Sequence, residues 1–287
     1  TAPFHKTDKG LRPEVATMSK APEKWDWAVR GNGSFKNAMD FDEYMVLCQK
    51  LDIKPLDVVN VFSHKYKNGP SLNELIETAV EWVKYANKMN YHVEYWQIGN
   101  EVDHHKNILS PEEYIDCYQK FAKAMKAVDA TIKVGPGILQ STKYFKDIVS
   151  MYPDLIDFTS SHQYMWKYLE TCKTYDLWKE HKSNYIPNIL KMQNAVRNSA
   201  KPNMEIVITE TGVSPSEKGM GNINNVYKAL WYFEVLMNEI SQSNVAYSYF
   251  WGTHAPWDGN KDNDESDVAV LLRIDDNSRK PIAEVVK

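Results

Sequence analysis

Hydrophobic and polar positions along this chain form two alternating kinds of pattern. Short runs rich in β-branched and aromatic residues predict strands at 56–62, 93–98, 132–135, 156–162, 205–209 and 245–251. Most of these runs are mainly apolar, as is typical of parallel strands that are buried on both faces. Between them, apolar residues recur every three or four positions and predict helices at 41–51, 71–90, 110–128, 144–151, 185–198 and 222–240.

Two of the predicted helices carry capping signals at their starts. Ser71 and Glu74 have the spacing of a capping box, in which each side chain bonds the backbone N–H of the other residue. Ser110 and Glu113 repeat this spacing, and Pro111 stands at the first helical position, where a missing N–H is tolerated. We therefore expect these two helices to begin directly after the serines.

The repeated strand–helix order favours an α/β fold with a parallel sheet. No internal repeat, low-complexity tract or Pro/Gly-rich linker divides the sequence, so we expect residues 1–287 to form a single barrel domain. Neither a GxGxxG motif after an early strand nor a GxxxxGK motif is present, which disfavours dinucleotide-binding and P-loop folds. We therefore prefer a (β/α)8 TIM barrel to an open, doubly wound sheet.

Composition narrows the classes of function. The 287 residues are 43% hydrophobic and 25% charged, which excludes a disordered or collagen-like chain. No apolar run approaches the ~20 residues that span a bilayer, so we expect no membrane partner. A net charge of −4 gives no electrostatic reason to bind nucleic acid. The three cysteines are odd in number and form no CxxC motif, so neither a disulfide framework nor a cysteine metal site is indicated.

Chemistry in a βα barrel is carried by residues at the carboxyl ends of the strands. Glu101 follows the strand predicted at 93–98, and Glu210 follows the strand predicted at 205–209. A single glutamate at the end of a strand is a plain surface charge about as often as it is a functional group. Two carboxylates at one barrel mouth suit glycoside hydrolysis, in which the retaining reaction uses a nucleophile and a proton donor about 5–5.5 Å apart.

Polar and aromatic residues near the other predicted strand ends fit a sugar site. An asparagine can hydrogen-bond a sugar 2-hydroxyl, histidine and tyrosine can keep a nearby carboxylate ionised, and tryptophan can stack on a sugar ring. The candidates for substrate binding are Asn60, Asn100, His162, Tyr164, Trp251 and Trp257.

Aromatic residues make up 12% of the chain, with 9 Trp and 17 Tyr, and several fall in predicted loops at the catalytic face. For Trp166, Tyr168 and Trp178, sugar stacking and simple loop packing remain open. Trp82 and Trp231 lie in predicted helices and are expected to pack against the barrel.

Two of these segments resemble known motifs. Residues 95–101 (YWQIGNE) resemble the strand-4 Asn-Glu motif of the clan A glycoside hydrolases, and residues 207–212 (VITETG) resemble the strand-7 nucleophile motif of that clan. Residues 37–61 resemble the corresponding stretch of its α-L-arabinofuranosidases and of the related β-xylosidase and agarase families. The resemblance covers most of the chain from about Trp25 onward, and the two motifs are specific when taken together.

The resemblance implies a retaining hydrolase that cleaves O-glycosidic bonds of an oligo- or polysaccharide, with a carbohydrate as partner and neither a cofactor nor a metal. It implies Glu101 as acid/base, Glu210 as nucleophile and Asn100 as the contact to the sugar 2-hydroxyl. His162 and Tyr164 become strand-6 groups around the nucleophile. Trp251 becomes a strand-8 platform, and the sugar and linkage stay open.

The chain departs from the pattern of the clan mainly at its beginning. Val102 replaces the proline that often follows Asn-Glu, which affects only the loop. Residues 1–36 look like a long loop, whereas 37–287 supply units equivalent to strands 3–8. The strand-2 arginine of the clan has no counterpart, because Arg12 and Arg30 stand in the wrong context. We therefore expect the first one or two βα units to be missing from this chain, and an associated N-terminal fragment to complete the barrel.

Other hypotheses remain open. A catalytically silent barrel homologue that binds glycans or has a structural or storage role fits the incomplete barrel. A second alternative is a metal-dependent hydrolase that uses His104, His105 and His162. Separately, residues 258–267 resemble the first part of a calcium-binding loop, but they lack its central Gly and its terminal Glu. The hydrolase hypothesis carries with it a secreted or extracytoplasmic location.

Overall fold

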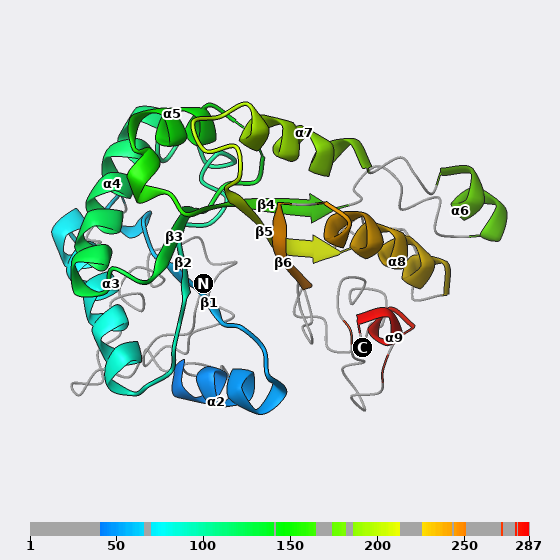
Figure 1. The fold of residues 1–287 in the computed structure, drawn as a ribbon, viewed down its shortest axis with the longest axis horizontal. Coiled ribbons are helices and arrows are strands. Elements are labelled where there is room, and N and C mark those ends of the chain that lie inside the picture. The colour runs from blue at the N-terminus through cyan, green and yellow to red at the C-terminus, as the bar shows by residue number, and fades with distance from the viewer. Residues whose placement is uncertain are drawn as a thin grey trace. The chain divides into compact units, whose positions relative to one another are not determined.

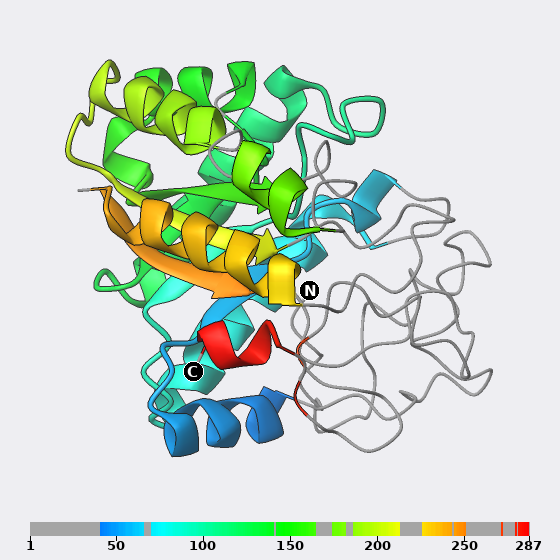
Figure 2. The same ribbon diagram turned by 90° about the vertical axis from the view of Figure 1, so that its right-hand side faces the viewer.

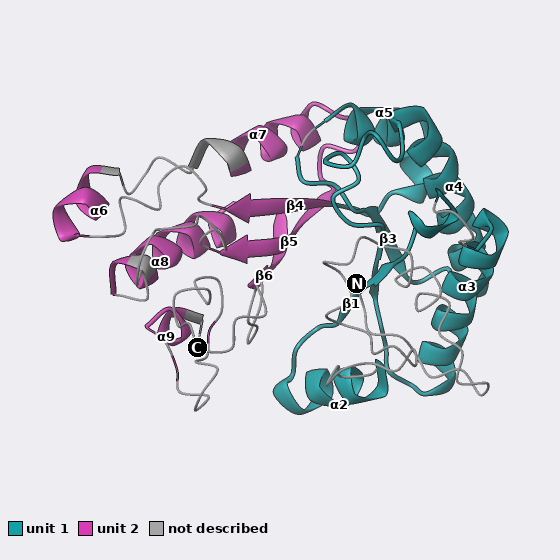
Figure 3. Cartoon of the chain, turned by 180° about the vertical axis from the view of Figure 1, so that it is seen from behind, with its two compact units in different colours: residues 1–159 teal, residues 160–287 magenta. Residues whose placement is uncertain are grey.

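The computed structural model describes residues 41–65, 70–140, 142–164, 174–181, 186–212, 226–242, 244–250, 271, 279 and 281–286. The chain divides into two compact units, residues 1–159 (unit 1) and 160–287 (unit 2), which Figure 3 distinguishes by colour. The expectation of a single barrel domain over residues 1–287 stays a prediction.

Unit 1 alternates helices and strands. Its elements are α2 (Phe41–Leu51), β1 (Leu56–Val59), η2 (Ser63–Lys65), α3 (Leu72–Lys88), β2 (Tyr95–Ile98), α4 (Pro111–Val128), β3 (Lys133–Pro136), α5 (Lys143–Met151) and η3 (Pro153–Leu155). The strands form a parallel sheet in the order β1-β2-β3, and α3, α4 and α5 lie on the same side of it (Figure 1). In register, Tyr95 of β2 pairs with Leu56 on one side and with Lys133 on the other.

The helix starts of unit 1 follow their capping signals. Ser71 accepts the N–H of Glu74, and the Glu74 carboxylate accepts the N–H of Ser71. Ser110 and Glu113 make the same reciprocal pair at the start of α4. These contacts satisfy N–H groups that have no partner within the helix, which explains why both helices begin where the sequence predicts.

The core of unit 1 lies between β2 and α4. All four residues of β2 are buried, and two tyrosines of α4 face the sheet. The Tyr114 hydroxyl donates to the Ile98 carbonyl at 2.6 Å, and the Tyr118 hydroxyl lies 3.2 Å from the Val134 carbonyl. These bonds join the helix to the backbone of two strands. The same two tyrosines therefore supply both the apolar packing of α4 on the sheet and its hydrogen bonds to the sheet.

Unit 2 carries the second sheet. Its elements are β4 (Phe158–Tyr164, which begins two residues before the unit boundary), α6 (Tyr175–His181), α7 (Ile186–Arg197), β5 (Glu205–Gly212), α8 (Val226–Ile240), β6 (Val245–Phe250) and α9 (Ala283–Val286). The sheet order is β4-β5-β6, and β5 and β6 are parallel. Helix α8 runs along this sheet (Figure 2).

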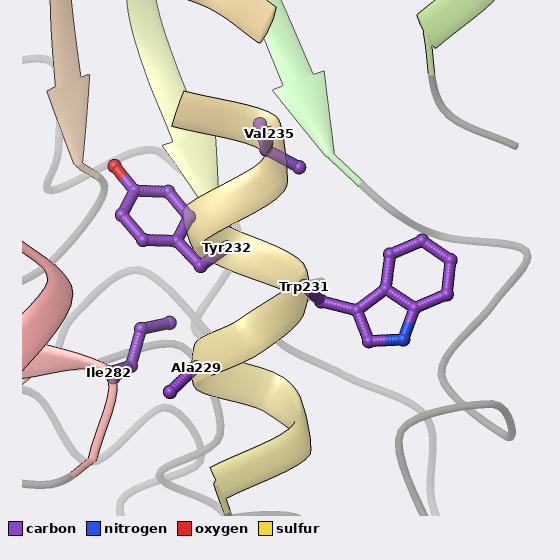
Figure 4. Close-up of a cluster of buried hydrophobic side chains, with 5 residues drawn as sticks. All are labelled: Ala229, Trp231, Tyr232, Val235 and Ile282. Atoms are coloured by element: carbon purple, nitrogen blue, oxygen red, sulfur yellow. The ribbon is translucent and has the colours of Figure 1, made fainter. Parts of the chain in front are cut away.

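A cluster of buried side chains holds α8 in place: Ala229, Trp231, Tyr232, Val235 and Ile282. In Figure 4, Ala229 and Tyr232 lie on the side of the helix nearest Ile282, and Trp231 extends from the other side. The Tyr232 ring meets the Phe250 ring of β6 edge-on at 4.9 Å. Trp231 is fully buried, which confirms its predicted packing role. Trp82 is half-buried and packs edge-on against Phe41 at 4.9 Å.

The predicted elements appear at nearly the predicted places, with three corrections. Strand β1 ends at Val59, not at residue 62, because the next residue begins a turn. Strand β5 continues to Gly212, since Thr211 pairs with Phe250, so Glu210 lies within a strand and not after it. Helices α6 and α9 were not predicted, because seven and four residues are too few to show a clear period.

No helix among the described ranges is both long and apolar enough to cross a bilayer.

Candidate active site

Glu210 lies at the centre of a small polar group in unit 2. Its carboxylate accepts a hydrogen bond from the Tyr164 hydroxyl at 2.8 Å. The Nδ1 atom of His162 stands 3.5 Å from the same carboxylate oxygen. Three of the sequence-predicted site residues therefore come together within one sheet.

Strand geometry explains this grouping. Side chains two residues apart on a strand share a face, so His162 and Tyr164 of β4 point the same way. Their rings stand 6.5 Å apart, and β5 is the neighbouring strand in the sheet. Glu210 faces them from β5, while its neighbour Thr211 turns to the opposite face.

The environment of Glu210 suits a reactive carboxylate. Its side chain is 18% exposed, whereas the His162 side chain is 1% exposed. A donated hydrogen bond favours the charged form of a carboxyl group, and the remaining exposure leaves an oxygen within reach of a ligand. The Tyr164 hydroxyl therefore orients a carboxylate that a ligand can still reach.

Glu101 lies in unit 1, in a tight turn after β2. The backbone is left-handed at Gly99 (φ 75°) and again at Glu101 (φ 50°). The Glu101 carbonyl accepts the N–H groups of His104 at 2.9 Å and His105 at 3.2 Å. A side chain at residue 99 would clash with Val61 and with Val102, so only glycine fits there.

Hydrogen bonds from the Gln97 side chain of β2 hold the turn that carries Glu101. This buried side chain donates from Nε2 to the Gly99 carbonyl at 2.9 Å and approaches Oδ1 of Asn100 at 3.4 Å. Asn100 is therefore oriented by a residue of the strand. The signal in the sequence was present, since Gln97 is the polar residue within an otherwise apolar strand.

Asp103 joins this turn to the loop after β3. Its carboxylate accepts the N–H of Leu139 at 2.8 Å and that of Gln140 at 3.3 Å. Burial raises the pKa of Asp103, although these backbone hydrogen bonds oppose the shift. The Val102 N–H also donates to the Gly137 carbonyl at 2.9 Å. The sequence showed Asp103 only as a neighbour of the predicted acid, not as an anchor.

The side chain of Asn60 is engaged in its own loop. Its Oδ1 accepts the N–H groups of Phe62 at 3.0 Å and Ser63 at 3.1 Å, and its Nδ2 donates to the Ser63 hydroxyl. Such a turn is a frequent structural use of asparagine. A contact between Asn60 and substrate stays a prediction.

The two histidines after Glu101 stack against each other and against the previous loop. Their rings lie 5.3 Å apart, and the His105 ring meets Phe62 edge-on at 5.6 Å. Burial lowers the pKa of His105, with His104 as a further cause. His105 thus packs between the two loops, and His104 packs against His105.

Several sequence-predicted residues lie outside the described residues. These are Trp251, Trp257, Trp166, Tyr168, Arg12, Arg30 and the segment 258–267. Trp178 is described: it lies in α6 and packs against the buried cluster on α8, which favours the packing alternative.

One residue that contacts this sheet escaped the sequence prediction. Glu239 near the end of α8 is 1% exposed and accepts hydrogen bonds from Thr211 at 2.9 Å and from Ser248 at 2.6 Å. A signal existed, because Glu239 continues the helical stripe of the buried residues Tyr232 and Val235.

Comparison with known proteins places these features in context. The family model described as "Alpha-L-arabinofuranosidase 1 domain" matches residues 14–184. A curated relative, the probable alpha-L-arabinofuranosidase C of Aspergillus fumigatus, is 23% identical over 251 residues, which cover 76% of this chain and 43% of the relative. The chain thus spans less than half the length of that relative.

Solved structures with a similar fold include a GH39 beta-xylosidase from Caulobacter crescentus. Its TM-score is 0.59 at 16% identity, and the match covers 90% of this chain and 59% of that one. A family 39 glycoside hydrolase from Bacteroides cellulosilyticus WH2 gives a TM-score of 0.58 at 16% identity, with 99% and 62% covered. These neighbours are TIM-barrel enzymes, so the likeness supports a partial (β/α)8 fold. The expected number of missing units stays a prediction.

Proposed function

The chain belongs to the family of the alpha-L-arabinofuranosidase 1 domain, and from this premise we propose that it is the catalytic part of a retaining glycoside hydrolase. The observation that carries the proposal is the environment of Glu210. A carboxylate that accepts a hydroxyl hydrogen bond at 2.8 Å and keeps 18% of its side chain exposed has the properties of a nucleophile.

In the proposed reaction, a carboxylate oxygen of Glu210 attacks the anomeric carbon while Glu101 gives its proton to the leaving oxygen. The bond to the leaving group breaks, and a glycosyl ester forms on Glu210. Glu101, now ionised, then takes a proton from water as this water attacks the anomeric carbon. The sugar leaves with retained configuration, and both glutamates return to their starting states.

The turn around Glu101 supports its role. A general acid must hold its position through both proton transfers. The Glu101 carbonyl accepts two backbone N–H groups, and the preceding residues are held by Gln97. Asn100, oriented by the same Gln97, is the proposed contact to the sugar 2-hydroxyl.

For the substrate, we propose an α-L-arabinofuranoside as the first candidate, because the family model and the curated relative both carry that name. A β-xyloside is the next, and glucosides and agarose stay open. We further propose that Asn60, Trp251 and Trp257 contact the carbohydrate, that no metal or cofactor takes part, that the protein acts outside the cytoplasm, and that an N-terminal fragment completes the barrel.

Covalent labelling tests the nucleophile. The purified protein, with any fragment that accompanies it, is incubated with a 2-fluoro-glycosyl inactivator and analysed by peptide mass spectrometry. The label is expected on Glu210, and Glu210→Ala should abolish it. The control Glu205→Gln removes a carboxylate from the other end of the same strand and should label normally. A label on another residue, or inverted configuration in a product NMR spectrum, would contradict the assignment.

The role of Glu101 is tested with a substrate whose leaving group needs no proton, such as a dinitrophenyl glycoside. Glu101→Ala should still form the glycosyl ester but hydrolyse it slowly, and added azide should accelerate turnover and give a glycosyl azide. The control Glu94→Gln removes a carboxylate whose partners are the half-exposed Lys133 and the exposed Lys54. Absence of azide rescue in Glu101→Ala, with the ester formed, would refute the acid/base role.

A further inference from the structure

Glu239 is a buried carboxyl group that the proposed reaction does not use. It belongs to α8, and each of its oxygens meets a hydroxyl of a different strand. Oε1 lies 2.9 Å from the Thr211 hydroxyl of β5, and Oε2 lies 2.6 Å from the Ser248 hydroxyl of β6. The carboxyl group therefore joins α8 to the neighbouring strands β5 and β6.

The Thr211 hydroxyl has two acceptors within reach. One is Glu239, and the other is the backbone carbonyl of Gln163 on β4 at 3.2 Å. A hydroxyl has one proton and can donate to only one of them at a time. When Glu239 is ionised it attracts that proton. When Oε1 of Glu239 carries a proton, it can donate to the Thr211 oxygen, and the Thr211 hydroxyl then donates to the Gln163 carbonyl.

Thr211 and Gln163 both lie next to residues of the Glu210 site, so the acceptor that Thr211 bonds can affect that site. Thr211 directly follows Glu210, and Gln163 lies between His162 and Tyr164, the two residues that face Glu210. A bond from Thr211 to Gln163 therefore joins the strand of the nucleophile to the strand of its neighbours at the level of the reaction.

We propose that Glu239 is a positioning residue for the Glu210 carboxylate: when ionised it accepts the hydrogen bond of the Thr211 hydroxyl, and when protonated it leaves that hydroxyl to donate to the Gln163 carbonyl. The inference rests on the proposed function of Glu210. The protonated state of Glu239 completes the link between β4 and β5, and the ionised state withdraws it.

The electrostatic setting supports a change of state near neutral pH. Burial raises the pKa of Glu239 to about 7, although hydrogen bonds from Ser248 and Thr211 oppose the shift. Tyr232 on the same helix is coupled to it, since burial and then Glu239 raise the pKa of Tyr232 well above its ordinary value.

Other titratable groups belong to the adjoining strands. Glu210 of β5 and His162 of β4 are on strands that meet the Glu239 network, and Tyr247 and Tyr249 flank Ser248 on β6. A readout is therefore needed that follows the Thr211 proton itself.

The sequence offers such a readout. Gln163–Tyr164 is the only Gln-Tyr pair in the chain. Labelling with ¹³C-carbonyl glutamine and ¹⁵N-tyrosine therefore isolates one peptide in an NMR spectrum, and its carbonyl shift reports the hydrogen bond from Thr211. In the wild type this shift should titrate with a midpoint near pH 7. It should be independent of pH in Glu239→Gln, which stays neutral, and in Thr211→Val, which has no hydroxyl.

The rate at which Glu210 is labelled tests whether this hydrogen bond affects the reactivity of Glu210. The rate of inactivation by a fluoro-sugar with a dinitrophenyl leaving group depends on Glu210 and not on a proton from Glu101. In the wild type this rate should fall about 5-fold above pH 7, the size expected for one hydrogen bond. Glu239→Gln should keep the higher rate throughout. The control Glu234→Gln, on the same helix and half-buried, should behave as the wild type.

Each outcome has one meaning. A Gln163 shift that does not titrate in the wild type, or that titrates unchanged in Glu239→Gln, overturns the proposal. Labelling with the same pH profile in wild type and Glu239→Gln overturns the positioning role alone. Absence of labelling in the wild type at every pH overturns the proposed function and the positioning role of Glu239 with it.

Discussion

A methyl group at residue 137 should displace the turn that carries Glu101. Gly137 lies directly after β3, where its backbone meets the turn after β2. A Cβ atom at this position would stand 2.0 Å from the Gly99 carbonyl oxygen and 2.4 Å from the Gly99 carbonyl carbon. Both are backbone atoms, so no side-chain rotation relieves the contact.

The size of the effect follows from these distances. Real Cβ contacts do not fall below 3.0 Å, so the two backbone segments must separate by about 1 Å. Overpacking of this kind costs about 1–3 kcal/mol of stability. A misplacement of about 1 Å near a reacting group can lower the rate ~100-fold, which corresponds to about 2.7 kcal/mol in the barrier.

Gly135→Ala is the matched control for Gly137→Ala. The same methyl group at residue 135 meets the Phe158 ring at 2.5 Å, a side chain and not the backbone of the Glu101 turn. Urea unfolding should show both variants destabilised. Per folded molecule, kcat/KM on an aryl arabinofuranoside should fall ~100-fold in Gly137→Ala and only a few-fold in Gly135→Ala. A wild-type kcat/KM in Gly137→Ala would refute the reasoning, because the turn would then tolerate the displacement.

Three further outcomes are expected. Tyr164→Phe removes the hydroxyl that bonds Glu210 at 2.8 Å. A hydrogen bond to a charged group contributes about 1.5–3 kcal/mol, and if that contribution is lost at the nucleophile, steady-state kinetics should show kcat/KM lower by roughly 10–100-fold, while circular dichroism should show the fold retained. Among the described residues, neither carboxylate oxygen of Asp57 has a hydrogen-bond partner, and burial raises its pKa from 3.8 to about 8. The folded state then holds this proton more tightly than the unfolded state, so the free energy of unfolding should fall as pH rises from about 4 to 8. The difference between the urea midpoints at pH 5 and pH 8.5 should therefore be smaller in Asp57→Asn than in the wild type. Ser110→Ala removes the acceptor for the Glu113 N–H and should cost about 1 kcal/mol; an unchanged urea midpoint would show that the cap contributes nothing.

Much of the fold was accessible from the sequence because it depends on neighbours along the chain. The capping pairs of α3 and α4 act over three residues, and the helical and strand periods repeat within single elements. The corrections at two strand ends have different causes, one distant along the chain and one local. Pairing with β6 carries β5 past Glu210, and a side-chain turn at Asn60 ends β1 early.

The candidate site divides in the same way. Glu101 and Glu210 were found from their places beside apolar strands. The sequence also placed Tyr164 near Glu210, but the 2.8 Å bond between them required the two strands to be neighbours. The hydrogen-bond partners of Asp103 and Glu239 could not be read from the sequence, because Leu139 lies 36 residues from Asp103 and Thr211 lies 28 residues from Glu239.

By itself, therefore, the sequence determined the order of the βα units, the starts of two capped helices and the glutamates suited to glycoside hydrolysis. Each of these depends on residue type and on spacing within a few positions. Only the tertiary structure decided which donor faces Glu210, why residues 99 and 137 must be glycine, and that Glu239 is buried against two hydroxyl groups. Those features depend on which strands and helices become neighbours, and local periodicity does not encode that choice.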